Sequence, residues 1–161
     1  MTSDQFKHTI APLHASLYRI AFHITGNHDD AMDALQETLI GLWRHNDQLA
    51  RSASPQAYCI TTLKNQCITL LRRRKISCDI NEARYSPDES DIASQTEQRD
   101  RLRKVKLAIT QLPPTQRRVI TLSAFGQCSN SEIAVITGLS EQNIRAALSR
   151  ARKKIKELFT P

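Results

Sequence analysis

Cationic and short polar side chains between Gly126 and Ile155 recur at positions that would place them on one side of a helix. Apolar residues fill the other side at three- and four-residue steps, which predicts one buried stripe: Ile144, Ala147, Leu148, Ala151 and Ile155. Guanidinium, ammonium, amide and hydroxyl groups of this kind contact phosphates and base edges of nucleic acid. The segment therefore predicts a cationic helix that could lie in a DNA groove.

Turn signals before this helix predict how it is positioned. Gly126 ends an earlier helix and allows a left-handed C-terminal conformation. Ser129 and Glu132 have capping-box spacing at the start of a short helix. Gly138 then permits a sharp turn, and Ser140 is a good N-cap for the cationic helix. This layout predicts a helix-turn-helix, whose second helix enters the major groove. The alternative is an ordinary amphipathic helix with a solvated basic face.

Charge is distributed unevenly along the 161 residues, whose net charge is +7. Residues 98–161 carry thirteen basic and four acidic side chains, whereas residues 79–97 carry one basic and six acidic side chains. A basic block is the electrostatic footprint expected for a nucleic-acid partner, although a cationic surface that serves only solubility is the alternative.

Helical periodicity and its breaks predict an all-α chain with two small domains. The first domain spans residues 1–76, and the second spans residues 97–161 and contains the helix-turn-helix. Residues 77–96 are rich in Ser, Asp and Glu and lack apolar periodicity, so they predict a flexible acidic linker.

Several breaks organise the first domain. A helix over residues 3–25 contains Pro12, which predicts a kink or a late start. Residues 45–53 predict a polar loop, and Ser54 followed by Pro55 predicts a new helix. That helix ends in four adjacent cations, residues 72–75. Cations suit the negative end of a helix dipole, but four exceed what capping needs and also indicate a phosphate contact.

Nothing in the chain predicts catalysis, a cofactor or a metal site. A Gly-rich phosphate loop and a metal-ligand cluster are both absent from the sequence. The acidic side chains of one helix favour a solvated face or a partner surface over a metal site: Asp29, Asp30, Asp33 and Glu37. The scattered cysteines favour small apolar residues or free thiols: Cys59, Cys67, Cys78 and Cys128. Without a signal peptide or an apolar run near the ~20 residues of a membrane span, we expect a cytoplasmic protein without membrane insertion.

Two blocks of sequence resemble the sigma factors of bacterial RNA polymerase. Residues 30–38 (DAMDALQET), 42–44 (LWR), 57–65 and 70–74 (LLRRR) resemble region two of that family. Residues 112–117 (LPPTQR), 132–134, 138–141 and 148–152 (LSRAR) resemble region four. Two domains with only a short tether between them are similar to the extracytoplasmic-function group. Tyr58 and Thr69 depart from the Trp and Asp that the family often has at these positions.

This resemblance implies partners and site residues. The partners are core RNA polymerase, through its β′ clamp helices and β flap, promoter DNA, and an anti-sigma factor. The residues implied for the β′ contact are Asp33, Gln36, Leu39 and Trp43, although Trp43 could instead be a core residue. Those implied for engaging and opening the −10 element are Arg51, Asn65, Arg72, Arg73 and Arg74. Those implied for reading the −35 element are Ser140, Glu141, Gln142, Asn143, Arg145, Ala146, Ser149, Arg150, Arg152 and Lys153.

Two other functions remain open from the residues themselves. One is a stand-alone helix-turn-helix regulator that binds an operator as a dimer. The other is a helical protein-interaction adaptor in which the basic block only confers solubility. Binding to an operator without polymerase would favour the first, and failure to bind any nucleic acid at low salt would favour the second.

Overall fold

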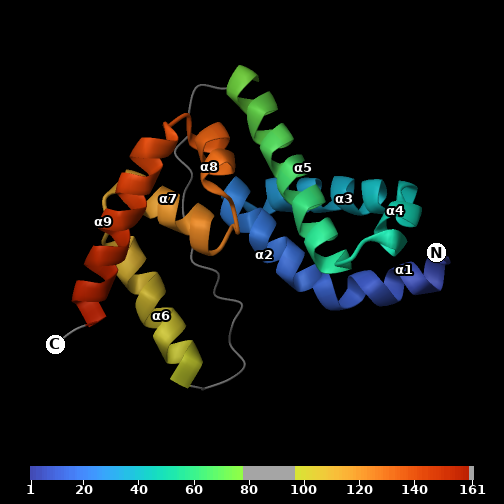
Figure 1. The fold of residues 1–161 in the computed structure, drawn as a ribbon, viewed down its shortest axis with the longest axis horizontal. Coiled ribbons are helices and arrows are strands. Elements are labelled where there is room, and N and C mark those ends of the chain that lie inside the picture. The colour runs from blue at the N-terminus through green and yellow to red at the C-terminus, as the bar shows by residue number, and fades with distance from the viewer. Residues whose placement is uncertain (78–96, 160–161) are drawn as a thin grey trace. The chain divides into compact units, whose positions relative to one another are not determined.

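A computed structural model describes residues 1–77 and 97–159, and every element in these two stretches is helical. The helices group into two compact units, one built from α1 to α5 and the other from α6 to α9 (Figure 1). The all-α prediction is therefore confirmed. The predicted acidic linker, except for Ser77 at the end of α5, lies outside the described residues.

Pro12 divides the first predicted helix into two. α1 (Ser3–Ile10) is followed by a 3-10 turn, η1 (Ala11–Leu13), and then by α2 (His14–Thr25). Proline has no backbone N–H and its ring collides with the carbonyl four residues earlier, so an α-helix does not continue smoothly through it. α2 ends at Gly26, whose φ of 85° is the left-handed conformation that glycine adopts without strain.

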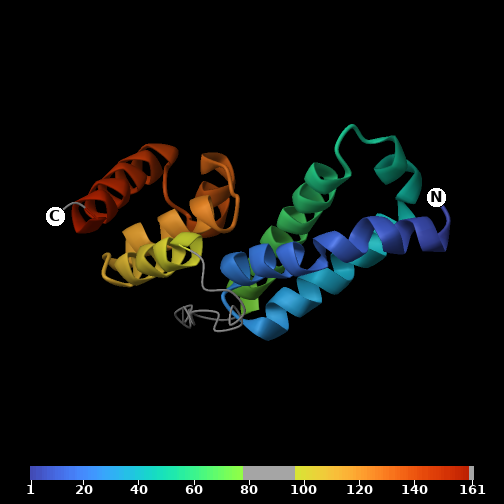
Figure 2. The same ribbon diagram turned by 90° about the horizontal axis from the view of Figure 1, so that it is seen from below.

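The core of unit 1 is formed by α2, α3 (His28–Arg44) and α5 (Pro55–Ser77), which pack against one another (Figures 1 and 2). Asn27 caps α3 because its side-chain oxygen accepts a hydrogen bond from the backbone N–H of Asp30 at 2.8 Å. Ser54 caps α5 in the same way, through the N–H of Ala57 at 3.2 Å. The large side chains at the centre are fully buried: Leu17, Ile24, Leu35, Leu42, Leu49 and Leu63.

The predicted polar loop at residues 45–53 is wrong, because this stretch contains the short helix α4 (Asn46–Arg51). Leu49 is its one apolar anchor and is 0 % exposed. The hydroxyl of Tyr58 on α5 donates a hydrogen bond to the side chain of Gln48 at 3.0 Å. Burial of one leucine and this tie to α5 favour a helical turn in a segment whose composition is typical of a loop.

Unit 2 contains α6 (Glu97–Thr110), α7 (Pro114–Ala124), α8 (Asn130–Thr137) and α9 (Glu141–Phe159). The Pro113-Pro114 pair separates α6 from α7, and Pro114 occupies the first helical position, where a missing N–H costs nothing. α9 packs against α6, α7 and α8. The buried side chains between these helices include Ile109, Val119, Leu122, Ile133, Ile144 and Leu148.

Candidate nucleic-acid interface

The α8–α9 pair has the caps and turn that the sequence predicts. The hydroxyl of Ser129 accepts from the N–H of Glu132 at 3.2 Å, and the carboxylate of Glu132 accepts from the N–H of Ser129 at 2.9 Å. Gly138 ends α8 with a φ of 79°, a conformation that other residues adopt only with strain. Ser140 then caps α9 by accepting from the N–H of Asn143 at 3.1 Å. These bonds and the left-handed Gly138 define where α8 begins and ends and where α9 begins.

The connection from α7 to α8 differs from the prediction at Gly126. α7 ends at Ala124 with Phe125 as a right-handed cap, and the N–H of Gly126 donates to the carbonyl of Thr121 at 3.1 Å. The left-handed residue is Gln127, with a φ of 54°. The left-handed conformation that Gly126 would allow is therefore taken by the next residue instead. Gln127 is not β-branched, so it adopts this conformation at a lower cost than a β-branched residue would, and sequence alone does not place it.

α9 is apolar on the side that faces the other helices of its unit and polar on the opposite side. Ile144, Ala147, Leu148 and Ala151 are buried, and Ile155 is half-buried. All ten residues predicted to read DNA are exposed: Ser140, Glu141, Gln142, Asn143, Arg145, Ala146, Ser149, Arg150, Arg152 and Lys153. The predicted amphipathic division of α9 is thus confirmed.

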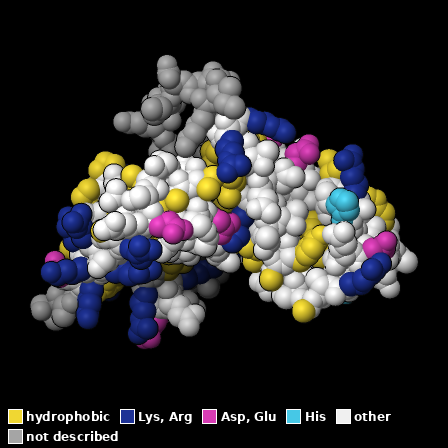
Figure 3. Space-filling view, turned by 45° about the horizontal axis from the view of Figure 1, so that its top comes forward, with side chains coloured by type: hydrophobic (Ala, Val, Ile, Leu, Met, Phe, Trp, Pro, Cys, Tyr) yellow, Lys and Arg dark blue, Asp and Glu magenta, His cyan; other side chains and the backbone are white. Residues whose placement is uncertain are grey.

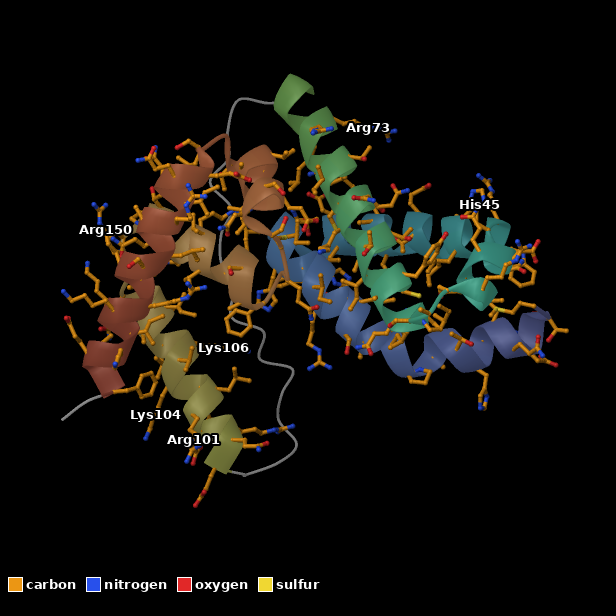
Figure 4. The ribbon with its side chains drawn as sticks, in the orientation of Figure 1. His45, Arg73, Arg101, Lys104, Lys106 and Arg150 are labelled. Carbon is orange, nitrogen blue, oxygen red and sulfur yellow. The ribbon has the colours of Figure 1, made fainter. Side chains whose placement is uncertain are left out.

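The exposed side of α9 is itself ordered into three tracks. Its centre is a track at steps of four, three and four residues, in which the short side chains of Ala146 and Ser149 lie between the longer ones of Gln142 and Lys153. Cations line both margins, with Arg145, Arg152 and Lys156 on one and Arg150 and Lys154 on the other. Arg150 projects outward from the helix (Figure 4), and Lys and Arg side chains spread over much of the visible face of this unit (Figure 3). We call this three-track surface the α9 face.

The arrangement of side chains on the α9 face suits a helix that enters a DNA major groove. Short side chains at the centre leave room for base edges to approach the helix, and amide and hydroxyl groups there can hydrogen-bond to bases. Long cationic side chains at both margins can reach the phosphates on either side of the groove. A helix-turn-helix uses its second helix in this manner.

The residues predicted for the −10 element lie in two places rather than one. Asn65, Arg72 and Arg73 are exposed on α5, and Arg73 lies near its C-terminal end (Figure 4). Arg51 is exposed on the last turn of α4, just before α5 begins. At about 1.5 Å per residue, α5 separates its first turn from its cation run by roughly 25 Å. The structure therefore does not bring Arg51 beside Arg72.

Arg74 forms an ion pair with Asp30 at the start of α3. The side chain of Asp30 is 3 % exposed, and it also accepts a hydrogen bond from the side-chain amide of Asn27 at 2.8 Å. Asp30 is therefore not on a solvated acidic face, which corrects the prediction for this residue. A buried carboxylate requires a partner of opposite charge. The ion pair supplies it and joins the start of α3 to the end of α5.

The outer side of α3 presents a polar and apolar stripe to solvent. Asp33, Gln36 and Trp43 are exposed, with Trp43 43 % exposed, whereas Leu39 is half-buried. The ring of Trp43 packs edge-to-face against Phe6 of α1, with centroids 5.2 Å apart. Trp43 is thus an outer-face residue rather than a core residue.

Comparison with known proteins identifies both units. Residues 9–76 match the Sigma-70 region 2 family, and residues 102–155 match the Sigma-70 region 4 family. The chain is 28 % identical to the ECF RNA polymerase sigma factor SigL of Mycobacterium tuberculosis over 88 % of its own length and 81 % of that protein. The two region matches occur in the order of the two units. The chain belongs to the extracytoplasmic-function sigma factors. As an alternative sigma factor, it directs transcription initiation.

Two further relatives agree with this assignment. The sigma factor is 26 % identical to the ECF RNA polymerase sigma factor EcfG of Rhodopseudomonas palustris, over 98 % of its length and 86 % of that protein. It also resembles the sigma factor RpoE of Bartonella quintana, solved in complex with the anti-sigma factor NepR, with a TM-score of 0.55, 25 % identity and 96 % of each chain covered.

One residue on the outer side of α3 is missing from the prediction. Ile40 is 46 % exposed and lies between Gln36 and Trp43. Residues 33, 36, 40 and 43 follow steps of three, four and three, so Asp33, Gln36, Ile40 and Trp43 form one stripe, which we call the α3 stripe. The sequence signal was an isoleucine placed outside the buried apolar periodicity of this helix. Leu39, which was predicted, lies at the margin of the stripe.

The described cysteines of the sigma factor are buried, and none of them forms a disulfide within the described residues: Cys59, Cys67 and Cys128. Burial raises the pKa of the Cys59 thiol. Cys78 lies outside the described residues. Within residues 1–77 and 97–159, no group of three potential metal ligands occurs, and none of the helices there combines the length and apolar character needed to span a bilayer.

Proposed function

We propose that the two units of this sigma factor divide promoter recognition between them. Unit 1 binds core RNA polymerase and engages the −10 element, and unit 2 reads the −35 element. The observation that carries this proposal is the α9 face, in which every residue predicted to contact DNA is exposed while the opposite side is buried. The match of the two units to sigma regions 2 and 4 supports the same division.

At the −35 element, residues at the centre of the α9 face would contact the bases, and cations at its margins would supply most of the affinity through phosphate contacts. Gln142, Ala146 and Ser149 lie on the central track, where base edges and thymine methyl groups would meet them. Arg145, Asn143 and Arg150 flank the track near the N-terminal half of α9. Helix-turn-helix proteins direct that half of the second helix toward the bases. Phosphate contacts from the marginal cations set the register.

For the −10 element, the exposed side of α5 supplies the contacts. Asn65 and Arg72 are seven residues apart and therefore share one side of the helix. Base capture from melted DNA is compatible with such a surface because unstacking costs only a few kcal/mol when a site receives the base. Arg74 is separated from this role by its ion pair with Asp30, so we assign it primarily to holding α5 against α3. Arg51 would meet DNA at a different point, near the first turn of α5.

For core polymerase, the α3 stripe supplies the contact with the β′ clamp helices. Exposed tryptophan and isoleucine beside carboxylate and amide groups form an apolar centre with a polar margin. Protein interfaces combine these features, and tryptophan is enriched among residues that dominate their affinity.

Unit 2 would contact polymerase as well, through the β flap. Leu102 on α6 and Leu158 and Phe159 on α9 are large apolar side chains left 36 %, 55 % and 42 % exposed. A contiguous patch of exposed apolar side chains marks a partner surface, and we propose that these three side chains contribute to one. We also propose an anti-sigma factor as a partner, because RpoE of Bartonella quintana, which this chain resembles over 96 % of its length, was solved with NepR.

Complex formation with core polymerase tests the division of roles. The full chain and its Gln142→Ala/Ser149→Ala variant should both co-elute with core polymerase in gel filtration, because their α3 stripes are the same. Only the unsubstituted chain should then confer binding to promoter DNA. Binding of an operator by the chain alone, as a dimer and without polymerase, would instead support a stand-alone regulator. Loss of polymerase binding in the α9 variant would contradict the proposed division.

A further inference from the structure

α1 adds an aromatic side chain to the side of unit 1 that carries the α3 stripe. Phe6 lies on α1, and its ring meets the indole of Trp43 at an interplanar angle of 68° with centroids 5.2 Å apart. This is the edge-to-face geometry that aromatic pairs favour. Phe6 precedes residues 9–76, the stretch that matches region 2, so the family match assigns it no role.

The backbone at both ends of this contact is fixed. α1 begins with a complete capping box, in which the Thr2 hydroxyl accepts from the N–H of Gln5 at 3.2 Å and the Gln5 side chain accepts from the N–H of Thr2 at 2.9 Å. Ile10, one turn after Phe6, is 6 % exposed and anchors the same side of α1. At the other end, the side-chain amide of Asn46 donates to the carbonyl of Trp43 at 2.7 Å.

With the backbone fixed, the orientation of the indole depends on its side-chain torsions. Trp43 is 43 % exposed at the end of α3, so packing restricts it on one side only. Within residues 1–77 and 97–159, its one aromatic contact is Phe6. A partner that binds a freely rotating indole must first immobilise it, whereas a pre-oriented indole loses less conformational freedom on binding.

We infer that Phe6 is a positioning residue for polymerase binding. Its ring edge holds Trp43 in the orientation that completes the α3 stripe, so that the part of α1 that precedes the region 2 match belongs to the docking surface. This inference rests on the proposed function of the α3 stripe. Phe6 acts through Trp43 and need not itself touch the polymerase.

Two substitutions of Phe6 by residues of similar size distinguish the effect of the aromatic ring from the effect of side-chain volume. Phe6→Leu keeps an apolar side chain but removes the ring edge, and Phe6→Tyr keeps the ring. We expect Phe6→Leu to weaken binding of the full chain to core polymerase about threefold to tenfold, the affinity equivalent of one aromatic pair. Phe6→Tyr should bind within about twofold of the unsubstituted chain. His8→Ala, an exposed position on the same helix, is the matched control and should bind normally.

Fluorescence reports the orientation of the indole independently of binding. Trp43 is the one tryptophan in the sequence, so the emission of the full chain comes from this site. Phe6→Leu should increase quenching of that emission by acrylamide and lower its anisotropy, and Phe6→Tyr should change neither. Circular dichroism of each variant shows that α1 is retained.

The variant Trp43→Ala distinguishes failure of this inference from failure of the proposed function. If Trp43→Ala binds polymerase normally, the α3 stripe is not the docking surface and both proposals fall. If Trp43→Ala weakens binding and Phe6→Leu does not, the role of Phe6 is refuted and that of the stripe stands. The inference also predicts that Phe6→Leu has no further effect in the Trp43→Ala background. If Phe6→Leu lowers polymerase affinity by the same factor in the Trp43→Ala background, Phe6 acts independently of the indole and the inference is overturned.

Discussion

Breaking the ion pair between Asp30 and Arg74 should destabilise unit 1 far more than removing a neighbouring cation. Among the described residues, Arg74→Ala leaves the Asp30 carboxylate, whose side chain is 3 % exposed, with the amide of Asn27 as its remaining side-chain donor. Asp30→Asn removes the charge but keeps an oxygen that can accept from Asn27. Arg72→Ala removes an exposed cation that lies two residues before Arg74 on α5, and it is the matched control.

The expected magnitude follows from the burial of the two partners. A hydrogen bond to a charged group contributes roughly 1.5–3 kcal/mol. Because the side chain of Arg74 is 54 % exposed, solvent screening reduces the effect, and we expect about 1–2 kcal/mol for Arg74→Ala. For a unit of this size each kcal/mol corresponds to roughly 4–8 °C in Tm. The expected loss is thus about 4–15 °C, whereas an exposed substitution such as Arg72→Ala should stay within about 0.5 kcal/mol.

Thermal unfolding followed by tryptophan fluorescence measures this loss in unit 1 alone, because the one tryptophan of the chain lies on α3. The double variant Asp30→Asn/Arg74→Ala should cost less than the sum of the single variants, since the neutral side chain no longer needs the cation. Equal Tm values for Arg74→Ala and Arg72→Ala, or full additivity in the double variant, would refute the structural role of the pair.

The remaining predictions concern DNA binding, polymerase binding and the buried thiol. Replacing Arg145 and Arg152 with Ala should lower the salt dependence of promoter binding by the holoenzyme. The slope of log affinity against log salt concentration should fall by up to about 0.9 for each phosphate that is no longer neutralised. Arg103→Ala, on α6, serves as the control, and an unchanged slope in a salt titration would argue against phosphate contacts by Arg145 and Arg152. Trp43→Ala should lose co-purification with core polymerase while its circular dichroism stays helical, and normal co-purification would contradict its place at the interface. The folded-state pKa of Cys59 is raised above its ordinary value of 9.0, so the contribution of this thiol to stability is complete below pH 9.0 and is lost as pH rises through the folded-state pKa. Chemical unfolding of Cys59→Ala should therefore show a smaller fall in unit 1 stability between neutral and strongly alkaline pH. An identical fall in the variant would count against titration of the buried thiol.

Local signals in the sequence were sufficient for most helix boundaries. The capping box at Ser129 and Glu132, the left-handed Gly138 and the Ser140 cap each involve residues at most three or four apart, so their chemistry can be read without knowing the fold. The amphipathic division of α9 could be predicted for the same reason, because helical periodicity fixes which residues share a side.

Features that depend on distant contacts could not be predicted. Asp30 resembles an ordinary first-turn carboxylate, and only the packing of α5 beside α3 places Arg74 against it. α4 has a loop-like composition, and it forms because Leu49 is buried among other helices. The pairing of Phe6 with Trp43 joins residues far apart in sequence, so no local pattern encodes it.

Run-off transcription with purified core polymerase and this chain, on fragmented genomic DNA of its source organism, tests the central claim most directly. The account predicts a discrete set of transcript 5′ ends that appear only when the chain is added and that share sequence blocks near −35 and −10. Those transcripts should disappear with Gln142→Ala/Ser149→Ala, whose substitutions lie on the central track of the α9 face. Initiation only at sites that core polymerase uses by itself would contradict the account.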